Sequence, residues 1–232
     1  NQRVSRIQLD EVVVTVPTAG DDLVVLHETS LILTEQRIAF IGPNGSGKST
    51  MARLLNGLVL PAAGRVLLDD LDVAAQPREA RRKVGFCFTD PSAQLVMPTV
   101  LEDVALSFRR IHRSKSARLA AARDVLERFG LTGMEDRSVH ALSGGQRQLL
   151  ALAGVLATEP SLLVADEPTT LLDLTNTRRI ADVLFSLPQQ LVLVTHDLDL
   201  AARCERAVLI RDGRIAKDGP APDVVEHYRA TA

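Results

Sequence analysis

The stretch that decides the fold is Phe40-Ile41-Gly42-Pro43-Asn44-Gly45-Ser46-Gly47-Lys48-Ser49-Thr50. It fits the phosphate-binding pattern G-x-x-x-x-G-K-[ST]. The apolar run before it predicts a buried strand, and residues 48–58 predict a helix. The expected apolar face of that helix consists of Met51, Leu54, Leu55 and Leu58.

A strand, a glycine-rich loop and a helix in this order predict a site for the phosphates of ATP. Successive backbone N–H groups and the positive end of the helix dipole favour anions at such a loop. We expect Lys48 to reach the β- and γ-phosphates and Ser49 to ligate Mg²⁺. The alternative is a glycine-rich turn with a solvated lysine.

Composition is typical of an ordinary globular protein. The 232 residues are 46% hydrophobic and 24% charged, and the net charge of −2 gives no support to nucleic-acid binding. Cys87 and Cys204 lack the spacing of a zinc site and suit a reducing compartment. The longest apolar stretch, 149–157, is far short of the ~20 residues that span a bilayer. Without a signal peptide either, we expect a cytosolic chain that meets membranes through a partner.

The pattern of elements predicts one α/β domain over residues 1–232. Segments 1–88 and 159–232 read as a nucleotide-binding core, which begins with an antiparallel β segment. Residues 89–158 carry almost no strand signal, so we interpret them as an inserted helical subdomain. Within the β segment, residues 23–26 and 30–33 predict two short strands.

Two later motifs extend the nucleotide site. Leu142-Ser143-Gly144-Gly145-Gln146 begins a helix, where backbone N–H groups could bind a second anion or Ser143 could act as a plain cap. The apolar run 162–165 ends in Asp166-Glu167. In a phosphate-loop NTPase, such a pair places Asp166 at Mg²⁺ and Glu167 at the attacking water.

The last part of the chain adds two candidates and a hairpin. Asp173 precedes a predicted helix, and His196 follows the buried strand 191–194 at the edge where α/β folds bind ligands. His196 could therefore contact a γ-phosphate. Asp212-Gly213 predicts a tight hairpin turn.

This ordered set resembles the ATP-binding subunit of ABC transporters along essentially the whole chain, and the stretch 142–146 is its most specific marker. The resemblance implies a RecA-like core and two subunits paired head to tail around two ATP molecules. It implies that Glu167 is the catalytic base and His196 the γ-phosphate sensor. It also implies that Ser143, Gly144, Gly145, Gln146 and Asp173 act on the nucleotide site of the neighbour.

A narrower resemblance covers residues 84–105, which look like the coupling segment of energy-coupling-factor (ECF) vitamin and metal importers. There Thr89 and Gln94 would be the coupling residues, with Leu95, Val96 and Met97 facing a transmembrane coupling protein. The implied partners are that protein, a small substrate-capture protein, and a second copy or a paralogous ATPase. The subunit would then be peripheral, on the cytoplasmic face of the cell membrane, and the overall likeness suggests a biotin importer.

Two positions depart from the family pattern. Thr89 stands where the family has a glutamine that ligates Mg²⁺, and no aromatic residue lies near Val16 to stack on adenine. Because base–aromatic stacking is worth roughly 1–3 kcal/mol, we expect weaker ATP binding and looser base selectivity.

Two other functions remain open from the sequence. A soluble ABC ATPase of translation or DNA repair usually has two cassettes or a long coiled-coil insertion, and this sequence has neither. A nucleotide-gated module that barely hydrolyses ATP would fit Thr89 but not the intact Glu167 and His196.

Overall fold

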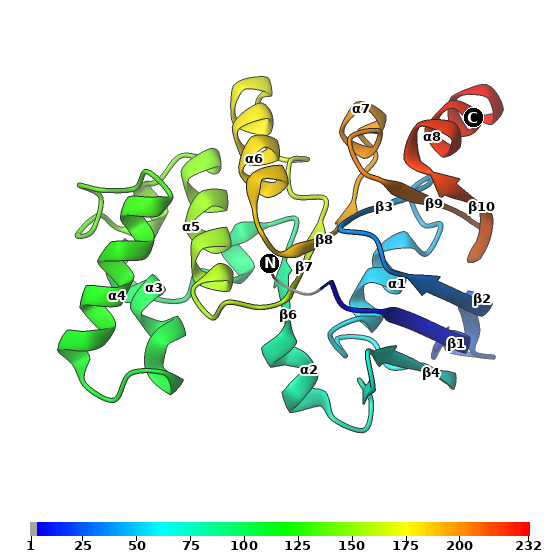
Figure 1. Cartoon of the computed structure of the whole chain (residues 1–232), viewed down its shortest axis with the longest axis horizontal. Coiled ribbons are helices and arrows are strands. Elements are labelled where there is room, and N and C mark those ends of the chain that lie inside the picture. The colour runs from blue at the N-terminus through cyan, green and yellow to red at the C-terminus, as the bar shows by residue number, and fades with distance from the viewer. Residues whose placement is uncertain (1–3) are drawn as a thin grey trace. The chain divides into compact units, whose positions relative to one another are not determined.

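The computed structural model describes residues 4–232, so residues 1–3 of the predicted domain lie outside the described part. Contacts divide the chain into two compact units. We call residues up to Phe86, with 161–167 and 187–232, the core unit. We call Cys87–Pro160 and Pro168–Ser186 the helical unit. Figure 1 labels the helices and most of the strands of both units.

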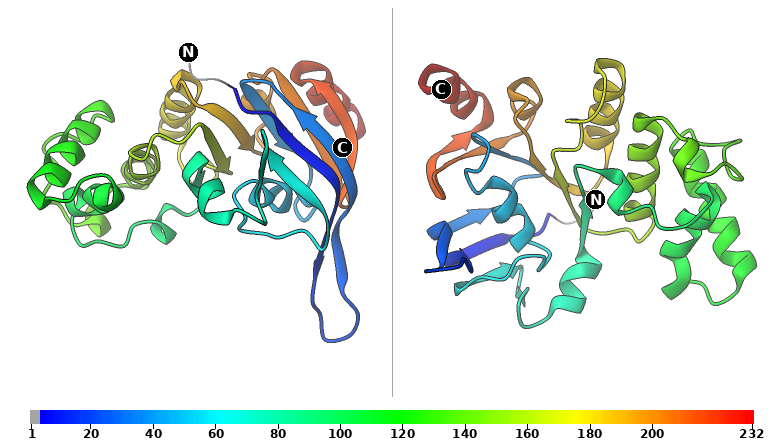
Figure 2. Two further views of the ribbon diagram at one scale, coloured as in Figure 1. Left: turned by 60° about the horizontal axis from the view of Figure 1, so that its bottom comes forward. Right: turned by 180° about the vertical axis from the view of Figure 1, so that it is seen from behind.

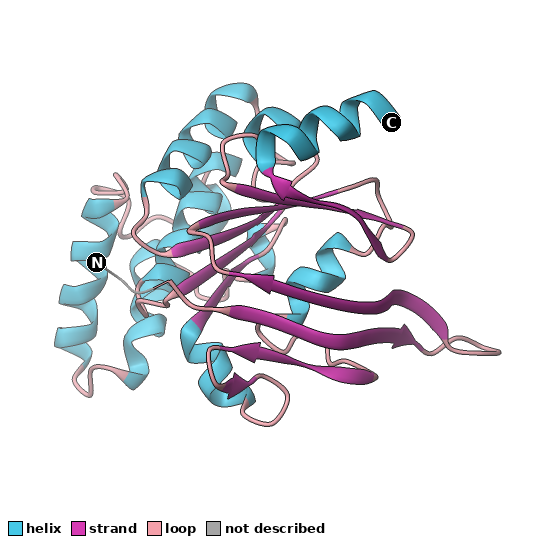
Figure 3. Ribbon diagram, turned by 45° about the vertical axis from the view of Figure 1, so that its right-hand side comes forward, coloured by secondary structure: helices cyan, strands magenta, loops and turns pink. Residues whose placement is uncertain are grey.

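The core unit contains two sheets, drawn in magenta in Figure 3. A four-stranded antiparallel sheet has the order β2-β1-β4-β5. Its strands are β1 (Ile7–Val16), β2 (Leu23–Leu33), β4 (Ala63–Leu68) and β5 (Leu71–Asp72). A six-stranded sheet has the order β10-β9-β3-β8-β7-β6. Its strands are β3 (Arg37–Ile41), β6 (Val84–Cys87), β7 (Leu162–Asp166), β8 (Gln190–Val194), β9 (Arg206–Arg211) and β10 (Arg214–Pro220).

The central strands of the larger sheet are parallel and buried. β3 pairs in parallel with β8 and β9, and β7 pairs in parallel with β8. Every residue of β7 and β8 is buried, as expected for strands covered on both faces. Helix α1 contacts β2, β3, β7 and β8, whereas α7 and α8 contact β3, β9 and β10 (Figure 1). The helices of this unit are α1 (Lys48–Leu54), α2 (Pro77–Lys83), α7 (Leu198–Ala201) and α8 (Ala221–Thr231).

The helical unit is built on four helices. α3 contacts α4 and α5, and α5 contacts α6. The bounds are α3 (Val100–Ser107), α4 (Lys115–Arg128), α5 (Gly144–Leu156) and α6 (Leu174–Ser186), with 3₁₀ turns at η1 (Pro91–Ala93), η2 (Phe108–Arg110) and η3 (Val139–Ala141). Gly130 follows the C-cap of α4 in the left-handed region, at φ 66°.

The predicted α/β class with an antiparallel β segment and inserted helices is confirmed, but some details of the elements differ. The predicted helix over 48–58 ends at Leu54, because Gly57 takes a left-handed φ of 73°, and Leu58 is therefore exposed. The two strands expected at 23–26 and 30–33 are one strand. β2 is an edge strand, and its pairing with β1 contains register shifts between Leu9 and Thr15. Because these shifts accommodate extra residues, the pairing continues past the polar residues inside β2.

The division of the chain also differs from the expected one. The sequence assigned all of 159–232 to the core, whereas residues 168–186 belong to the helical unit. The reason is the packing of α6 on α5, which an alternation of strands and helices does not reveal. The predicted hairpin turn is confirmed, since Asp212 and Gly213 both have positive φ, at 48° and 68°. Figure 2 shows the longer β1–β2 hairpin in blue.

Candidate functional site

The site of the core unit lies where three neighbouring parallel strands end. The phosphate loop follows β3, Asp166 ends β7, and His196 follows β8. The sheet order β3-β8-β7 places these carboxyl ends along one edge, which is where open α/β sheets bind ligands.

Glycines shape the phosphate loop. Gly42 has a φ of 149°, and a Cβ there would lie 2.1 Å from the carbonyl oxygen of Ile210. Gly47 has a φ of 101° and precedes α1. Pro43, Asn44 and Gly45 form the exposed tip of the loop. The loop is held from outside by a hydrogen bond that the Gly213 N–H donates to the Ser46 carbonyl over 2.9 Å.

The loop fits the phosphates of ATP. The Lys48 side chain is 5% exposed, and its ammonium donates to the Pro43 carbonyl oxygen over 3.2 Å, so the cation lies against its own loop. The Ser46 hydroxyl is buried and has no hydrogen-bond partner among residues 4–232. A buried hydroxyl without a partner is costly unless a ligand satisfies it. Thr50 is half-buried on α1.

The structure brings together the two residues expected at Mg²⁺. The Ser49 hydroxyl donates to Oδ1 of Asp166 over 2.9 Å, and Asp166 is 1% exposed. Hydroxyl and carboxylate oxygens are the donors that Mg²⁺ prefers, often with only one or two carboxylates from the protein. The donor set therefore fits the ion.

Sequence reasoning missed Arg53. Its guanidinium lies 3.2 Å from Oδ2 of Asp166, so this buried carboxylate has both a hydroxyl and a cation against it. The spacing could have revealed Arg53, because residues i and i+4 of a helix share a face and Ser49 is four residues earlier.

Glu167 and His196 form a close pair. Nδ1 of His196 lies 2.8 Å from Oε2 of Glu167. Glu167 has a φ of 50°, an unusual backbone conformation that surrounding contacts must hold in place. Such conformations cluster at functional sites. One such contact is the hydrogen bond from the Glu167 N–H to the Val194 carbonyl oxygen, 2.9 Å long. The candidate base and the candidate sensor thus contact each other within one unit.

Val16 lies at the end of β1 and pairs with Leu23 across the hairpin. Both side chains are exposed, as is Val24. This surface is apolar but not aromatic.

The helical unit places the Leu142–Gln146 stretch at the start of α5. Ser143 accepts a hydrogen bond from the Gln146 N–H, and the Gln146 side chain accepts one from the Ser143 N–H. This reciprocal capping box fixes the helix start, so Ser143 does act as the cap. Gly144 is exposed and Gly145 is buried.

Thr89 lies close to this helix start. A cavity of about 170 Å³ is lined by Thr89, Asp90, Gly144, Arg147 and Leu172, among others. The helical unit thus brings Thr89, one of the two predicted coupling residues, together with the glycine-rich helix end.

Gln94 has an internal partner. Its Oε1 accepts a hydrogen bond from the Phe88 N–H over 3.1 Å, which closes the loop between the two residues. Asp103, which the sequence did not single out, accepts from the Val96 and Met97 N–H groups over 2.8 and 2.9 Å. Burial raises the pKa of Asp103, and these two bonds oppose the rise. Between these two anchors Val96 is 66% exposed.

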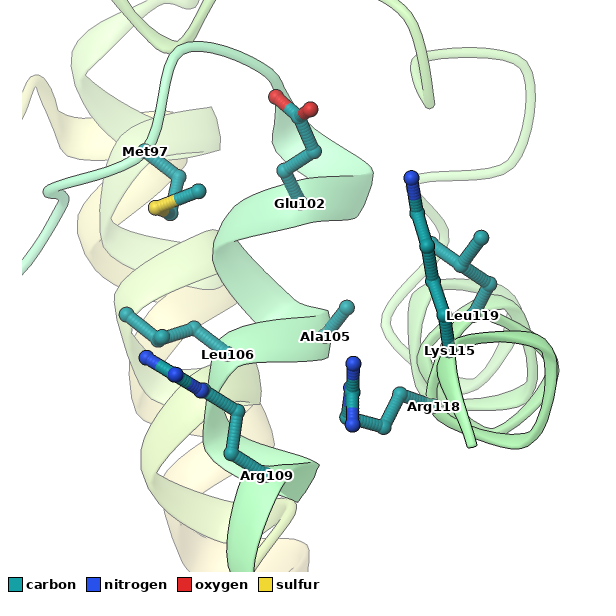
Figure 4. A pocket seen from close by; sticks show the side chains of 8 residues that line it. All are labelled: Met97, Glu102, Ala105, Leu106, Arg109, Lys115, Arg118 and Leu119. Atoms are coloured by element: carbon teal, nitrogen blue, oxygen red, sulfur yellow. The ribbon is translucent and has the colours of Figure 1, made fainter. Parts of the chain in front are cut away.

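A groove lies beside this segment, between α3 and α4 (Figure 4). Its volume is about 320 Å³. Apolar side chains are combined with three cations and one carboxylate along it. The lining residues are Met97, Glu102, Ala105, Leu106, Arg109, Lys115, Arg118 and Leu119.

Comparisons with known proteins identify the family. Residues 26–170 match the family described as ABC transporter. A provisionally named ABC transporter ATP-binding protein of Deinococcus radiodurans is 47% identical over 209 residues, covering 90% of this chain and 92% of the relative. The biotin transport ATP-binding protein BioM of Rhizobium etli is 42% identical, with 90% and 93% covered.

Solved structures agree with these relatives. CbiO1 of Clostridium perfringens, described as part of the ABC transporter complex CbiONQ, matches with a TM-score of 0.82 at 27% identity, over 97% of this chain and 92% of that one. The ATP-binding cassette MJ0796, a dimer bound to ADP and phosphate, matches with a TM-score of 0.83 at 29% identity, over 93% and 98%. The chain belongs to the ABC transporter family and is an ABC ATPase, which binds and hydrolyses ATP in transport. No helix within residues 4–232 is long and apolar enough to cross a membrane.

Proposed function

We propose that this chain is the ATP-hydrolysing motor subunit of an ECF-type importer for a vitamin or metal, peripheral on the cytoplasmic face of the membrane. The observation that carries the catalytic part is the Glu167–His196 pair beside Asp166 at one edge of the sheet. The importer class is supported by the similarity to BioM and CbiO1, and the name of BioM makes biotin the first substrate to test.

In this proposal each residue of the core site has a defined role. The Gly42–Thr50 loop and Lys48 bind the phosphates, and Ser49 and Asp166 would hold Mg²⁺, which would neutralise charge on the phosphates. Glu167 accepts a proton from the water that attacks the γ-phosphorus, and ADP leaves. Because His196 lies 2.8 Å from Glu167, one imidazole can orient the base and contact the γ-phosphate.

The nucleotide site is completed by a second subunit, identical or paralogous. Ser143–Gln146 and Asp173 of one subunit would act on the phosphate loop of the other. Three observations support this pairing: the exposed Gly144, the capped helix end and the dimeric MJ0796 structure.

Transmission to the membrane would run through Thr89 and Gln94 to the segment Leu95–Met97. Gln94 acts by holding the loop from inside, through the Phe88 N–H, so the exposed Val96 is the better candidate for direct contact. We assign this segment, which is anchored by Gln94 and Asp103 and exposes Val96, to the contact with a transmembrane coupling protein, which works with a small substrate-capture protein.

A mixed dimer tests the shared site. One subunit carries Lys48→Ala and the other Gly144→Asp, and both carry Glu167→Gln so that ATP stays bound. If the glycine-rich helix end acts across the dimer, both defects fall in one site and the other site is intact. We expect one trapped ATP per mixed dimer and close to none in either parent dimer. An empty mixed dimer would contradict the shared site.

Gly144 is a better position than Gly145 for this substitution. A Cβ at Gly144 would lie 3.6 Å from the Leu172 side chain and 4.0 Å from the Leu171 carbonyl oxygen, whereas one at Gly145 would lie 2.1 Å from the Asn176 side chain. The membrane partners are tested separately, by affinity purification from detergent-solubilised membranes and identification of the bound proteins. Recovery of no integral membrane protein would contradict the importer assignment.

A further inference from the structure

Asn176 connects the two segments that the proposed function assigns to the neighbouring subunit. It lies in the first turn of α6, three residues after Asp173. Its backbone N–H donates to Oδ1 of Asp173 over 2.8 Å, and its side-chain Nδ2 donates to Oδ2 over 3.0 Å. Both oxygens of this carboxylate are therefore held by one residue.

The other end of the same side chain lies against Gly145. A Cβ at Gly145 would be 2.1 Å from Oδ1, 2.4 Å from Cγ and 3.0 Å from Cβ of Asn176. The amide therefore covers the Cα of the second residue of α5, and α5 and α6 lie side by side (Figure 1). This contact explains why Gly145 is buried although Gly144, one residue earlier, is exposed.

We propose that Asn176 is a positioning residue, which fixes Asp173 relative to the Ser143–Gln146 helix end so that both meet the partner's ATP as one rigid surface. This inference rests on the proposed shared site. Asn176 touches no reacting atom in it. Small errors of placement in such an assembly are costly, because contacts made at two points require the correct spacing between them.

The substitution Asn176→Asp separates positioning from stability. The new carboxylate keeps the size of the amide and its contact with Gly145, but it repels Asp173 instead of donating to it. An acid in the first turn of a helix is favourable, and α6 has none there. The variant should therefore fold as well as the parent, and its thermal midpoint checks this. Thr175→Asp is the matched control, since it adds the same charge to the same turn from an exposed position.

Two mixed dimers locate the effect, again with Glu167→Gln in all subunits. In the first, an Asn176→Asp subunit is paired with a Lys48→Ala subunit, so the intact phosphate loop faces an intact Asn176. In the second, an otherwise unchanged subunit is paired with a Lys48→Ala, Asn176→Asp subunit, so the intact loop faces the altered residue. We expect labelled ATP to leave the second dimer about tenfold faster, the order of effect of one charge-assisted hydrogen bond.

Equal release rates in the two dimers, or faster release from the first, would overturn the proposal. A similar effect of Thr175→Asp would also overturn it, because charge alone would then be sufficient. Asn176→Ala, which removes the bond without adding charge, should act in the same direction and serves if the aspartate variant folds poorly. Gly144→Asp in the Lys48→Ala subunit tests the premise: unchanged release there would refute the shared site itself rather than the role of Asn176.

Discussion

The phosphate loop and the segment from Phe88 to Asp103 are held in place in different ways. The loop is fixed by its backbone: positive φ at Gly42 and Gly47, and contact with the β9–β10 hairpin. The later segment is fixed by side chains that bond to its backbone, Gln94 at one end and Asp103 at the other. A loop fixed by backbone geometry suits a ligand that is always the same, whereas side-chain anchors leave the exposed residues between them free to differ with the partner.

Removal of the proposed base beside the phosphate loop should give the largest effect, a fall in ATP turnover. Glu167→Gln keeps the phosphate loop and the side chain's size but removes the base, so turnover should fall by about 10²–10⁴-fold while ATP binding persists. Steady-state ATPase assays and a binding titration measure the two quantities. Turnover within a few-fold of the parent would show that Glu167 is not the catalytic base.

The next prediction sharpens the claim that the loop is held by its backbone. Gly42→Ala should cost about 3 kcal/mol in the free energy of unfolding, because the new Cβ meets the Ile210 carbonyl at 2.1 Å. Gly45→Ala is the matched control in the same loop. Gly45 also has a positive φ, of 75°, but a Cβ there meets nothing within 4 Å, so only the conformational cost of about 1 kcal/mol remains. Equal losses in urea unfolding would show that contact with the hairpin does not hold the loop.

The difference between backbone fixation and side-chain anchoring also explains how much of each region the sequence could predict. The loop and its strand and helix were predictable because the pattern fixes glycine, lysine and serine at set offsets, and the Asp166-Glu167 pair follows an unmistakable buried strand. Asn176 and Asp103 were not predictable, because their partners are backbone or side-chain groups whose positions depend on how helices pack. The assignment of α6 to the core failed for the same reason.

The smallest expected effect concerns the side-chain anchors and depends on pH. Asp103→Ala removes the acceptor of two N–H groups and should cost about 2 kcal/mol of unfolding free energy. Asp103→Asn is the informative control, since its amide oxygen still accepts both bonds but cannot ionise. Because burial raises the pKa of Asp103, the folded chain binds that proton more tightly than the unfolded chain does. The stability from this proton is complete below the ordinary aspartate pKa of about 3.9 and is lost as the pH rises through the raised value.

The stability of Asp103→Asn relative to the parent should therefore increase as the pH rises from about 4, and level off once Asp103 is ionised. Urea unfolding of both proteins across this pH range measures the difference. A difference that stays constant would mean that the ionised carboxylate is fully compensated by the Val96 and Met97 N–H groups. A difference that shrinks with rising pH would mean that the charge strengthens these bonds by more than burial costs, and the anchor would then be strongest in its ionised form. In either case ionisation of Asp103 would not weaken the anchor of the segment Leu95–Met97, and this side-chain anchor would then withstand a rise in pH as well as the backbone contacts that hold the phosphate loop do.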